Sequence, residues 1–138
     1  MPGNIVLKEE PPDINRYRDL FCTTGWNEEY KVTSGMMQTV LNNSWYIVSA
    51  YIDEKLVGFG RVITDGILHA MIYEMIVDPE FQGKGIGTQI LKMLVGKCKQ
   101  QGIRDIQLFC ARGKKEFYIK NGFESRPDDA PGMQYMIK

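Results

Sequence analysis

The sequence has few of the residues on which several kinds of functional site depend. Its 138 residues include one histidine, His69, and three cysteines without a Cys-x-x-Cys spacing. An odd cysteine count without that spacing argues against a disulfide framework and a cysteine-rich zinc site. A single histidine leaves little for a histidine-rich metal centre or a Ser-His-Asp triad. The sequence therefore predicts a protein without a metal site, in a reducing compartment such as the cytoplasm.

The sequence also lacks an excess of charge of either sign and a long apolar run. Seventeen basic and 17 acidic residues cancel, which argues against nucleic acid as the partner. No apolar run reaches the roughly 20 residues of a membrane span, and the charged, proline-containing residues 1–18 do not resemble a secretory signal. The length and the 43% hydrophobic content are typical of one domain over residues 1–138.

A change in hydrophobic period divides the first half of the chain. Apolar residues recur at helical spacing before residue 44 and alternate as in strands after it. The pattern predicts, in order, a strand over 4–8, a helix from Asp13, a helix over about 28–41, and three antiparallel strands over 45–51, 56–64 and 67–77.

The second half begins with a glycine-rich loop and an amphipathic helix. The pattern predicts a loop over 80–88, a helix to about Gln101, a strand over 103–110, a short helix over 113–121 and a last strand over 134–137. Because strand 103–110 follows a strand and a crossover helix, we expect it to pair parallel to strand 67–77. The order predicts an α+β fold, in which an antiparallel meander is followed by one parallel step.

Three glycines alternate directly before the long helix, at Gly83, Gly85 and Gly87. Glycine lets backbone N–H groups approach a ligand closely, and a helix start offers unpaired N–H donors with a partial positive charge. Lys84 adds a full positive charge, and Thr88 adds a hydroxyl. These features predict a site for a phosphate or diphosphate group.

Two other phosphate-binding patterns fit this spacing less well. A Walker loop needs a Gly-Lys-Ser/Thr run, whereas Lys84 precedes Gly85 here. The dinucleotide pattern GxGxxG lacks its third glycine, since Thr88 or Ile90 takes that place. One parallel crossover is also fewer than a dinucleotide fold uses. A nucleotide-dependent oxidoreductase is therefore disfavoured.

The pattern Gln-x-x-Gly-x-Gly, after a strand that ends in Val-Asp-Pro, fits the loop better. It resembles the coenzyme A loop of the GNAT N-acetyltransferase superfamily, with Gln82, Gly85 and Gly87 at the fixed places. A second motif of that family, Phe-Tyr-x-x-x-Gly-Phe, is matched by residues 117–123. The order of elements agrees as well, so the resemblance covers nearly the whole chain.

The resemblance implies acetyl-CoA as co-substrate and direct attack of an amine on the thioester in a ternary complex. N–H groups near Ile76, usually at a β-bulge in this family, would stabilise the oxyanion. The residues expected to bind the coenzyme lie on the strand edge, in the loop and on the short helix: Met75, Ile76, Val77, Gln82, Gly83, Lys84, Gly85, Ile86, Gly87, Thr88 and Phe117.

Two side chains are candidates for proton transfer. Tyr118 takes the place of the family's tyrosine, which implies a general acid for the departing thiolate; a core aromatic is the alternative. Glu74 is the candidate general base because a carboxylate in an apolar strand needs a cleft or a partner; a solvent-facing residue is the alternative. Tyr73, with opposite alternation, is expected to pack, and His69 to be structural.

The acceptor site is the least specified. The resemblance implies that residues 21–30, with Trp26, and the tail over 126–135 form it. The tail is similar to that of bacterial small-molecule GNATs, which favours a small primary amine. The family leaves a homodimer open. The alternative function is a non-catalytic acyl-CoA sensor or interaction module of the same fold.

Overall fold

The computed structural model describes residues 3–137. Residues 1 and 2 of the N-terminal segment and residue 138, all included in the predicted domain, lie outside the described residues. The chain forms two compact units, one that ends at Leu108 and one that starts at Phe109. The single domain over 1–138 stays a prediction. None of the helices in the described part of the chain is long and apolar enough to cross a membrane.

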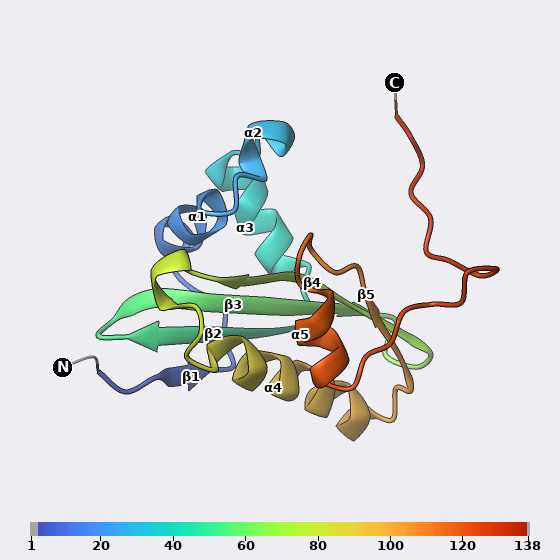
Figure 1. Ribbon diagram of the computed structural model, residues 1–138. Coiled ribbons are helices and arrows are strands. Elements are labelled where there is room, and N and C mark those ends of the chain that lie inside the picture. The colour runs from blue at the N-terminus through green and yellow to red at the C-terminus, as the bar shows by residue number, and fades with distance from the viewer. Residues whose placement is uncertain (1–2, 138) are drawn as a thin grey trace. The chain divides into compact units, whose positions relative to one another are not determined.

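The first unit contains a five-stranded sheet (Figure 1). Its strands lie side by side in chain order: β1 Val6–Lys8, β2 Tyr46–Ile52, β3 Lys55–Thr64, β4 His69–Val77 and β5 Asp105–Leu108. The first three pairings are antiparallel, and β4 pairs with β5 in parallel. The predicted fold, an antiparallel meander followed by one parallel step, is therefore confirmed.

Helices cover both faces of this sheet (Figure 1). One face carries α1 Ile14–Cys22, α2 Asn27–Tyr30 and α3 Ser34–Asn42, and the other carries α4 Ile86–Gln101. The short 3-10 helix η1, Pro79–Phe81, links β4 to the glycine-rich loop.

The single helix expected over 28–41 is wrong, because α2 and α3 are separate. Lys31 takes a left-handed conformation, with φ of 53°, and ends α2. Thr33 then starts a new helix, since its hydroxyl accepts the Met36 N–H at 3.2 Å. Between them, the Asn27 side chain accepts the Val32 N–H at 2.6 Å. Local polar contacts therefore divide the helix, although the apolar residues keep a helical spacing in the sequence.

Two apolar layers hold the sheet between the helices. Tyr17, Leu20, Phe21, Met37 and Leu41 of α1 and α3 pack on Ile47, Phe59 and Ile76 of the sheet. On the other face, the predicted stripe of α4 is buried at Ile86, Ile90, Leu91, Leu94 and Cys98. Two glycines of β3, Gly58 and Gly60, let this helix approach closely, since a Cβ on either would lie 2.7 Å from an Ile90 or Leu94 methyl carbon.

The second unit contains α5, Lys115–Lys120, and a long extended segment. The strand expected over 134–137 is not formed. A strand needs a hydrogen-bonding partner, and the described residues from Phe109 on contain no other strand. The apolar side chains near the end of the chain are 73–88% exposed: Met133, Tyr135, Met136 and Ile137.

Candidate active site

The edge of β4 is open over its second half. Parallel pairing joins His69–Ile72 of β4 to Asp105–Leu108 of β5 and then stops. Residues 73–77 pair with β3 on one side, while no strand of the described chain pairs with them on the other. This segment includes Met75, Ile76 and Val77, for which contacts to an extended ligand were predicted. Unpaired backbone groups at a strand edge suit a ligand with amide groups.

A β-bulge interrupts β4 in the same segment. Arg61 of β3 pairs with Tyr73, and Phe59 pairs with Ile76, so that Glu74 and Met75 together face a single residue, Gly60. Glu74 has a φ of 47°, which is rare for a residue with a side chain. Bulges take backbone groups out of the ladder. The bulge expected near Ile76 is thus found at Glu74 and Met75.

The side chain of Glu74 forms an ion pair with Arg61. Arg61 Nε donates to Glu74 Oε2, and Nη2 donates to Oε1 at 3.4 Å. The Arg61 guanidinium also lies 5.4 Å from the centre of the Tyr73 ring. Tyr73 was expected to point away from Glu74 and pack, but both contact Arg61 and Tyr73 is 37% exposed. The bulge explains this, because it shifts the alternation of side chains by one residue.

Tyr17 of α1 lies within electrostatic reach of this pair. Burial raises the pKa of the Tyr17 phenol well above its ordinary value, the charge of Glu74 raises it further, and Arg61 offsets part of the effect. Tyr17 is 1% exposed, and its phenol keeps its proton at neutral pH because its pKa is raised. The face of the bulge toward α1 thus carries one carboxylate, one guanidinium and a neutral phenol.

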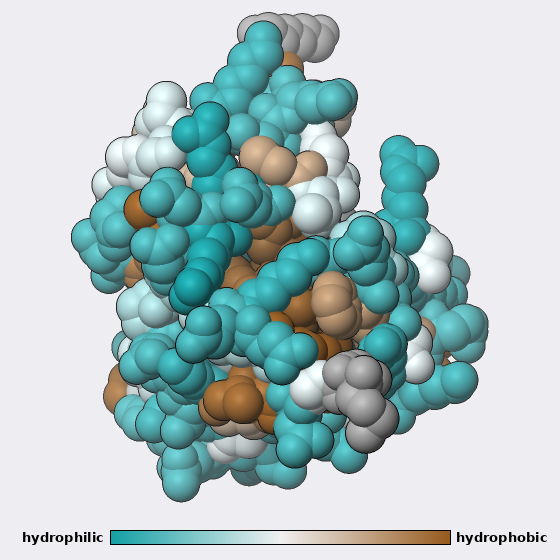
Figure 2. All heavy atoms as spheres, turned by 90° about the vertical axis from the view of Figure 1, so that its left-hand side faces the viewer, coloured by the Kyte–Doolittle hydropathy of each residue, from teal (hydrophilic) through white to brown (hydrophobic). Residues whose placement is uncertain are grey.

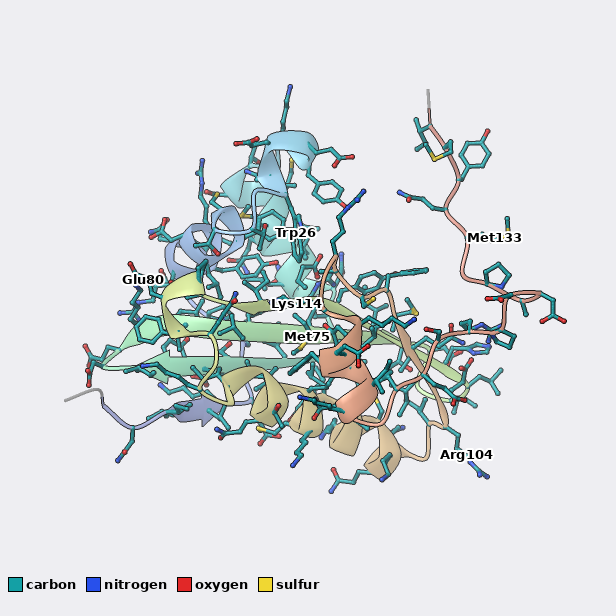
Figure 3. The ribbon with its side chains drawn as sticks, viewed as in Figure 1. Trp26, Met75, Glu80, Arg104, Lys114 and Met133 are labelled. Carbon is teal, nitrogen blue, oxygen red and sulfur yellow. The ribbon has the colours of Figure 1, made fainter. Side chains whose placement is uncertain are left out.

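The glycine-rich loop begins where β4 ends. Asp78 starts η1, and its carboxylate accepts the Glu80 N–H at 2.9 Å. Gln82 folds back and donates from Nε2 to the Val77 carbonyl at 3.1 Å. Figure 3 shows Glu80 at this end of the sheet and Met75 further along β4. The loop therefore lies next to the open strand edge and is tied to it by side chains.

Two glycines of the loop adopt conformations that disfavour other residues. Gly83 and Gly85 each have a φ of 80°, and a Cβ on either would meet nothing within 4 Å. Packing therefore does not explain them. Gly85 is the N-cap of α4, and no side chain caps the helix there. The first N–H groups of α4, at Ile86, Gly87 and Thr88, are consequently available to an anion.

Two lysines flank the loop. The Lys84 ammonium lies 5.6 Å from the Phe81 ring centre, and that of Lys55, the first residue of β3, lies 5.2 Å from it. Lys55 also lies 3.6 Å from the Asp78 carboxylate. Viewed from this end, hydrophilic side chains surround a central group of apolar ones (Figure 2). The loop therefore combines uncapped N–H donors with nearby positive charge.

The remaining predicted site residues, Phe117 and Tyr118, belong to α5 in the second unit. The Tyr118 ring lies 5.0 Å from that of Phe117 and 5.9 Å from that of Phe123. Burial, with a smaller contribution from Cys110, raises the pKa of Tyr118 to about 12. The first unit thus brings together Glu74, the open edge and the loop, while the two aromatic residues form a cluster of their own.

Arg61 and Lys55 were missed by the sequence reasoning. The signal for Arg61 was available, since a charged residue in the apolar strand LVGFGRVIT resembles Glu74 in MIYEMIV. His69, expected to be structural, contacts Asp105 where β4 and β5 begin to pair. No group of three or more His, Cys, Asp or Glu residues in the described chain could hold a metal ion.

Comparison with known proteins identifies the family. Residues 43–125 match the model of the acetyltransferase (GNAT) domain. The chain belongs to the GNAT acetyltransferase family. It is 33% identical over 127 residues to an uncharacterised N-acetyltransferase of Pyropia yezoensis, covering 88% of this chain and 71% of that protein. It spans only about a third to a half of several other relatives, among them a chloroplastic GCN5-related N-acetyltransferase of Arabidopsis thaliana.

Solved structures of GNAT proteins share the fold. A GNAT-family acetyltransferase of Streptococcus pneumoniae is 27% identical and has a TM-score of 0.83, with 98% of this chain and 99% of that chain covered. An N-acetyltransferase of Thermoplasma acidophilum, solved in complex with coenzyme A, is 22% identical and has a TM-score of 0.70, with 89% and 91% covered.

Proposed function

We propose that this GNAT protein transfers the acetyl group of acetyl-CoA to a primary amine of a small molecule. The observation that carries the proposal is the loop over residues 82–88, in which Gly83 and Gly85 have left-handed conformations without a packing reason and which leads into a helix that no side chain caps. Such a loop suits a diphosphate. The open edge of β4 beside it suits the amide-containing arm of the same molecule.

The residues of the first unit fit acetyl-CoA as substrate. The N–H groups from Gln82 to Thr88 would bind the diphosphate, and Lys84 would add positive charge. Residues 75–77 would pair with the amides of the arm. The Thermoplasma relative bound to coenzyme A supports this choice of ligand. No metal is needed for the reaction, because backbone N–H groups can stabilise the oxyanion.

The proposed chemistry needs a proton acceptor for the amine and a proton donor for the sulfur. An amine at neutral pH is protonated, since its ordinary pKa is about 10, and Glu74 would take that proton directly or through a water. The amine nitrogen then forms a bond to the acetyl carbon and loses its second proton to solvent, and the carbon–sulfur bond breaks. Tyr118 would donate its proton to the departing sulfur and take up another from solvent. The bulge at Glu74 and Met75 would supply N–H groups to the oxygen of the acetyl group.

The small amine is supported by the tail sequence and by the helices above β4. Trp26, between α1 and α2, packs edge-on against Phe21 with ring centres 5.9 Å apart, and it is only half-buried. An exposed indole face suits a cationic or aromatic amine. The proposed site needs neither nucleic acid nor a second copy of the chain for its chemistry.

An amine panel with acetyl-CoA tests the proposal. We expect at least one small primary amine to gain an acetyl group, with one coenzyme A released for each product. The product is followed by mass, because Cys22 and Cys110 are exposed thiols that would react with thiol reagents. Calorimetric binding of acetyl-CoA without product from any amine would favour the non-catalytic sensor. No binding at all would refute both functions.

A further inference from the structure

Arg61 is a cation buried in the middle of β3, with 8% of its surface exposed. Burying a charge is costly unless it is paired and hydrogen-bonded. Its guanidinium has three partners: the Glu74 carboxylate, the Ser44 hydroxyl and the Tyr73 ring. This arrangement satisfies the charge, but an apolar residue at this place would have been simpler for stability alone.

Glu74 is the partner whose conformation needs support. A left-handed φ is unfavourable in a residue with a side chain and persists only where the surroundings enforce it. Arg61 reaches Glu74 with two nitrogens, one to each carboxylate oxygen. Such a fork fixes the direction of a carboxylate as well as its place. Without it, the carboxylate could rotate about its own side-chain bonds.

The other end of the guanidinium is fixed to the end of α3. Arg61 Nη1 donates to Ser44 Oγ at 3.3 Å, and the Ser44 hydroxyl donates to the Val40 carbonyl at 2.9 Å. Arg61 therefore connects α3 to the bulge of β4. Among the described residues, the phenol of Tyr17, from α1, acts electrostatically on this pair, and the Tyr73 ring lies beside the guanidinium.

We propose that Arg61 is a positioning residue, which holds the carboxylate of Glu74 in the direction from which it takes the proton of the acceptor amine. This inference rests on the proposed function, in which Glu74 is the base. A purely structural ion pair would stabilise the fold equally but would not act on the rate through Glu74. The two roles therefore differ in how substitutions at the two positions combine.

A double-mutant cycle tests the inference. We expect Arg61→Gln to lower kcat about 10- to 100-fold, because a misdirected base loses its alignment, and to leave the KM for acetyl-CoA unchanged. In a Glu74→Gln background, Arg61→Gln should lower kcat further by less than about twofold. Arg61→Lys keeps the charge but loses the two-nitrogen contact with the carboxylate. Its kcat should therefore lie between those of Arg61→Gln and the wild-type protein.

Two further variants control for folding. Arg104→Gln alters an exposed arginine at the far end of the sheet from Glu80 and should leave kcat unchanged (Figure 3). Ser44→Ala removes one anchor of Arg61 and should lower kcat about two- to fivefold with the KM for acetyl-CoA unchanged. Thermal unfolding of each variant shows that it is folded at the assay temperature. If neither Arg61 variant is folded, the result for Ser44→Ala decides, and an unchanged kcat overturns the inference.

The other outcomes separate the inference from the function it rests on. Equal loss from Arg61→Gln in both backgrounds overturns the positioning role alone. Full activity of Glu74→Gln overturns the base and the positioning role together, while acetyl transfer itself stands. Absence of transfer to any amine refutes the proposed function.

Discussion

Tyr118 combines a buried phenol with a strongly raised pKa. Burial moves the pKa to about 12, so the phenol keeps its proton across the range in which enzymes are assayed. In the proposed reaction, such a phenol would stay protonated and would donate a hydrogen bond to the departing thiolate, although it is a weak acid in water.

We expect Tyr118→Phe to lower kcat about 10- to 100-fold with a small change in the KM for acetyl-CoA. Because the raised pKa means that the proton is lost only at high pH, kcat of the unchanged protein should not fall through Tyr118 ionisation below about pH 11. The pH dependence of kcat for both proteins checks this. A fall of kcat between about pH 8 and 10 that disappears in Tyr118→Phe would contradict the raised pKa, and full activity of Tyr118→Phe would contradict the role as proton donor.

At the residue scale, local signals were predictable and long-range partners were not. Glu74 is conspicuous because it is an acid in an apolar strand. Its partner Arg61 lies 13 residues earlier, on a neighbouring strand whose register the sequence does not specify. The placement of Tyr73 was wrong for a related reason. Strict alternation assumes a regular strand, and nothing in the local sequence indicates the extra residue of a bulge.

At the element scale, the start of α4 has a left-handed glycine, Gly85, as its N-cap and no side chain that caps it. Gly85→Ala places a side chain at a φ of 80°, which costs about 1 kcal/mol. If binding needs this loop conformation, that strain corresponds to about a fivefold higher KM for acetyl-CoA.

Gly96→Ala is the matched control, since Gly96 lies in the exposed middle of the same helix and a Cβ there would meet nothing within 4 Å. It should stabilise the protein by about 0.5–1 kcal/mol without a change in KM. Steady-state kinetics and urea unfolding of the two variants measure both effects. An unchanged KM in folded Gly85→Ala would argue against a ligand at the loop.

The contact between β3 and α4 gives a prediction about stability. A Cβ on Gly60 would lie 2.7 Å from Leu94 Cδ1, 2.9 Å from Met75 Sδ and 3.0 Å from Ile90 Cγ2. These flexible ends must shift, so we expect Gly60→Ala to reduce the free energy of unfolding by about 1–3 kcal/mol. Urea unfolding checks it against the exposed Gly96→Ala, and equal stability of the two variants would contradict the close packing.

The helices and strands could be predicted from the sequence where the spacing of apolar residues and the capping residues indicated the same limits. The sequence predicted α4 to Gln101 because its stripe, the preceding glycines and Gly102 all point to the same limits. It failed over 28–41, where Lys31 adopts a conformation that is usual for glycine. It also failed over 134–137, because a strand depends on a partner elsewhere in the chain, whereas a helix satisfies its own backbone.

At the scale of the whole molecule, buried tyrosines make the free energy of unfolding depend on pH in the alkaline range. Burial raises the pKa of Tyr17 and Tyr46 in the folded state, and for Tyr46 a hydrogen bond to Glu9 adds to this. A raised folded pKa means that the folded state holds the proton more tightly. The resulting stability is complete below about pH 10, the unfolded value, and is lost as pH rises toward the folded value.

We therefore expect the free energy of unfolding to fall above pH 10 by up to about 1.4 kcal/mol per pH unit for Tyr17, and by less for Tyr46, whose phenol lies nearer to solvent. Urea unfolding at about pH 8, 10 and 11 measures the slope, and Tyr17→Phe should make it shallower. Tyr30, which is 66% exposed, offers the control substitution Tyr30→Phe. A stability that does not change up to about pH 11 would show that these phenols ionise freely in the folded protein.

The half-paired β4 has a consequence for backbone amides in solution. N–H groups of residues 73–77 that point away from β3 have no strand acceptor in the described chain, so they should exchange with deuterium quickly in the free protein. A bound thioester arm would shield them, and exchange there should slow while that of β2 stays the same. Mass spectrometry of deuterium uptake could thus locate the ligand before any acceptor amine is known.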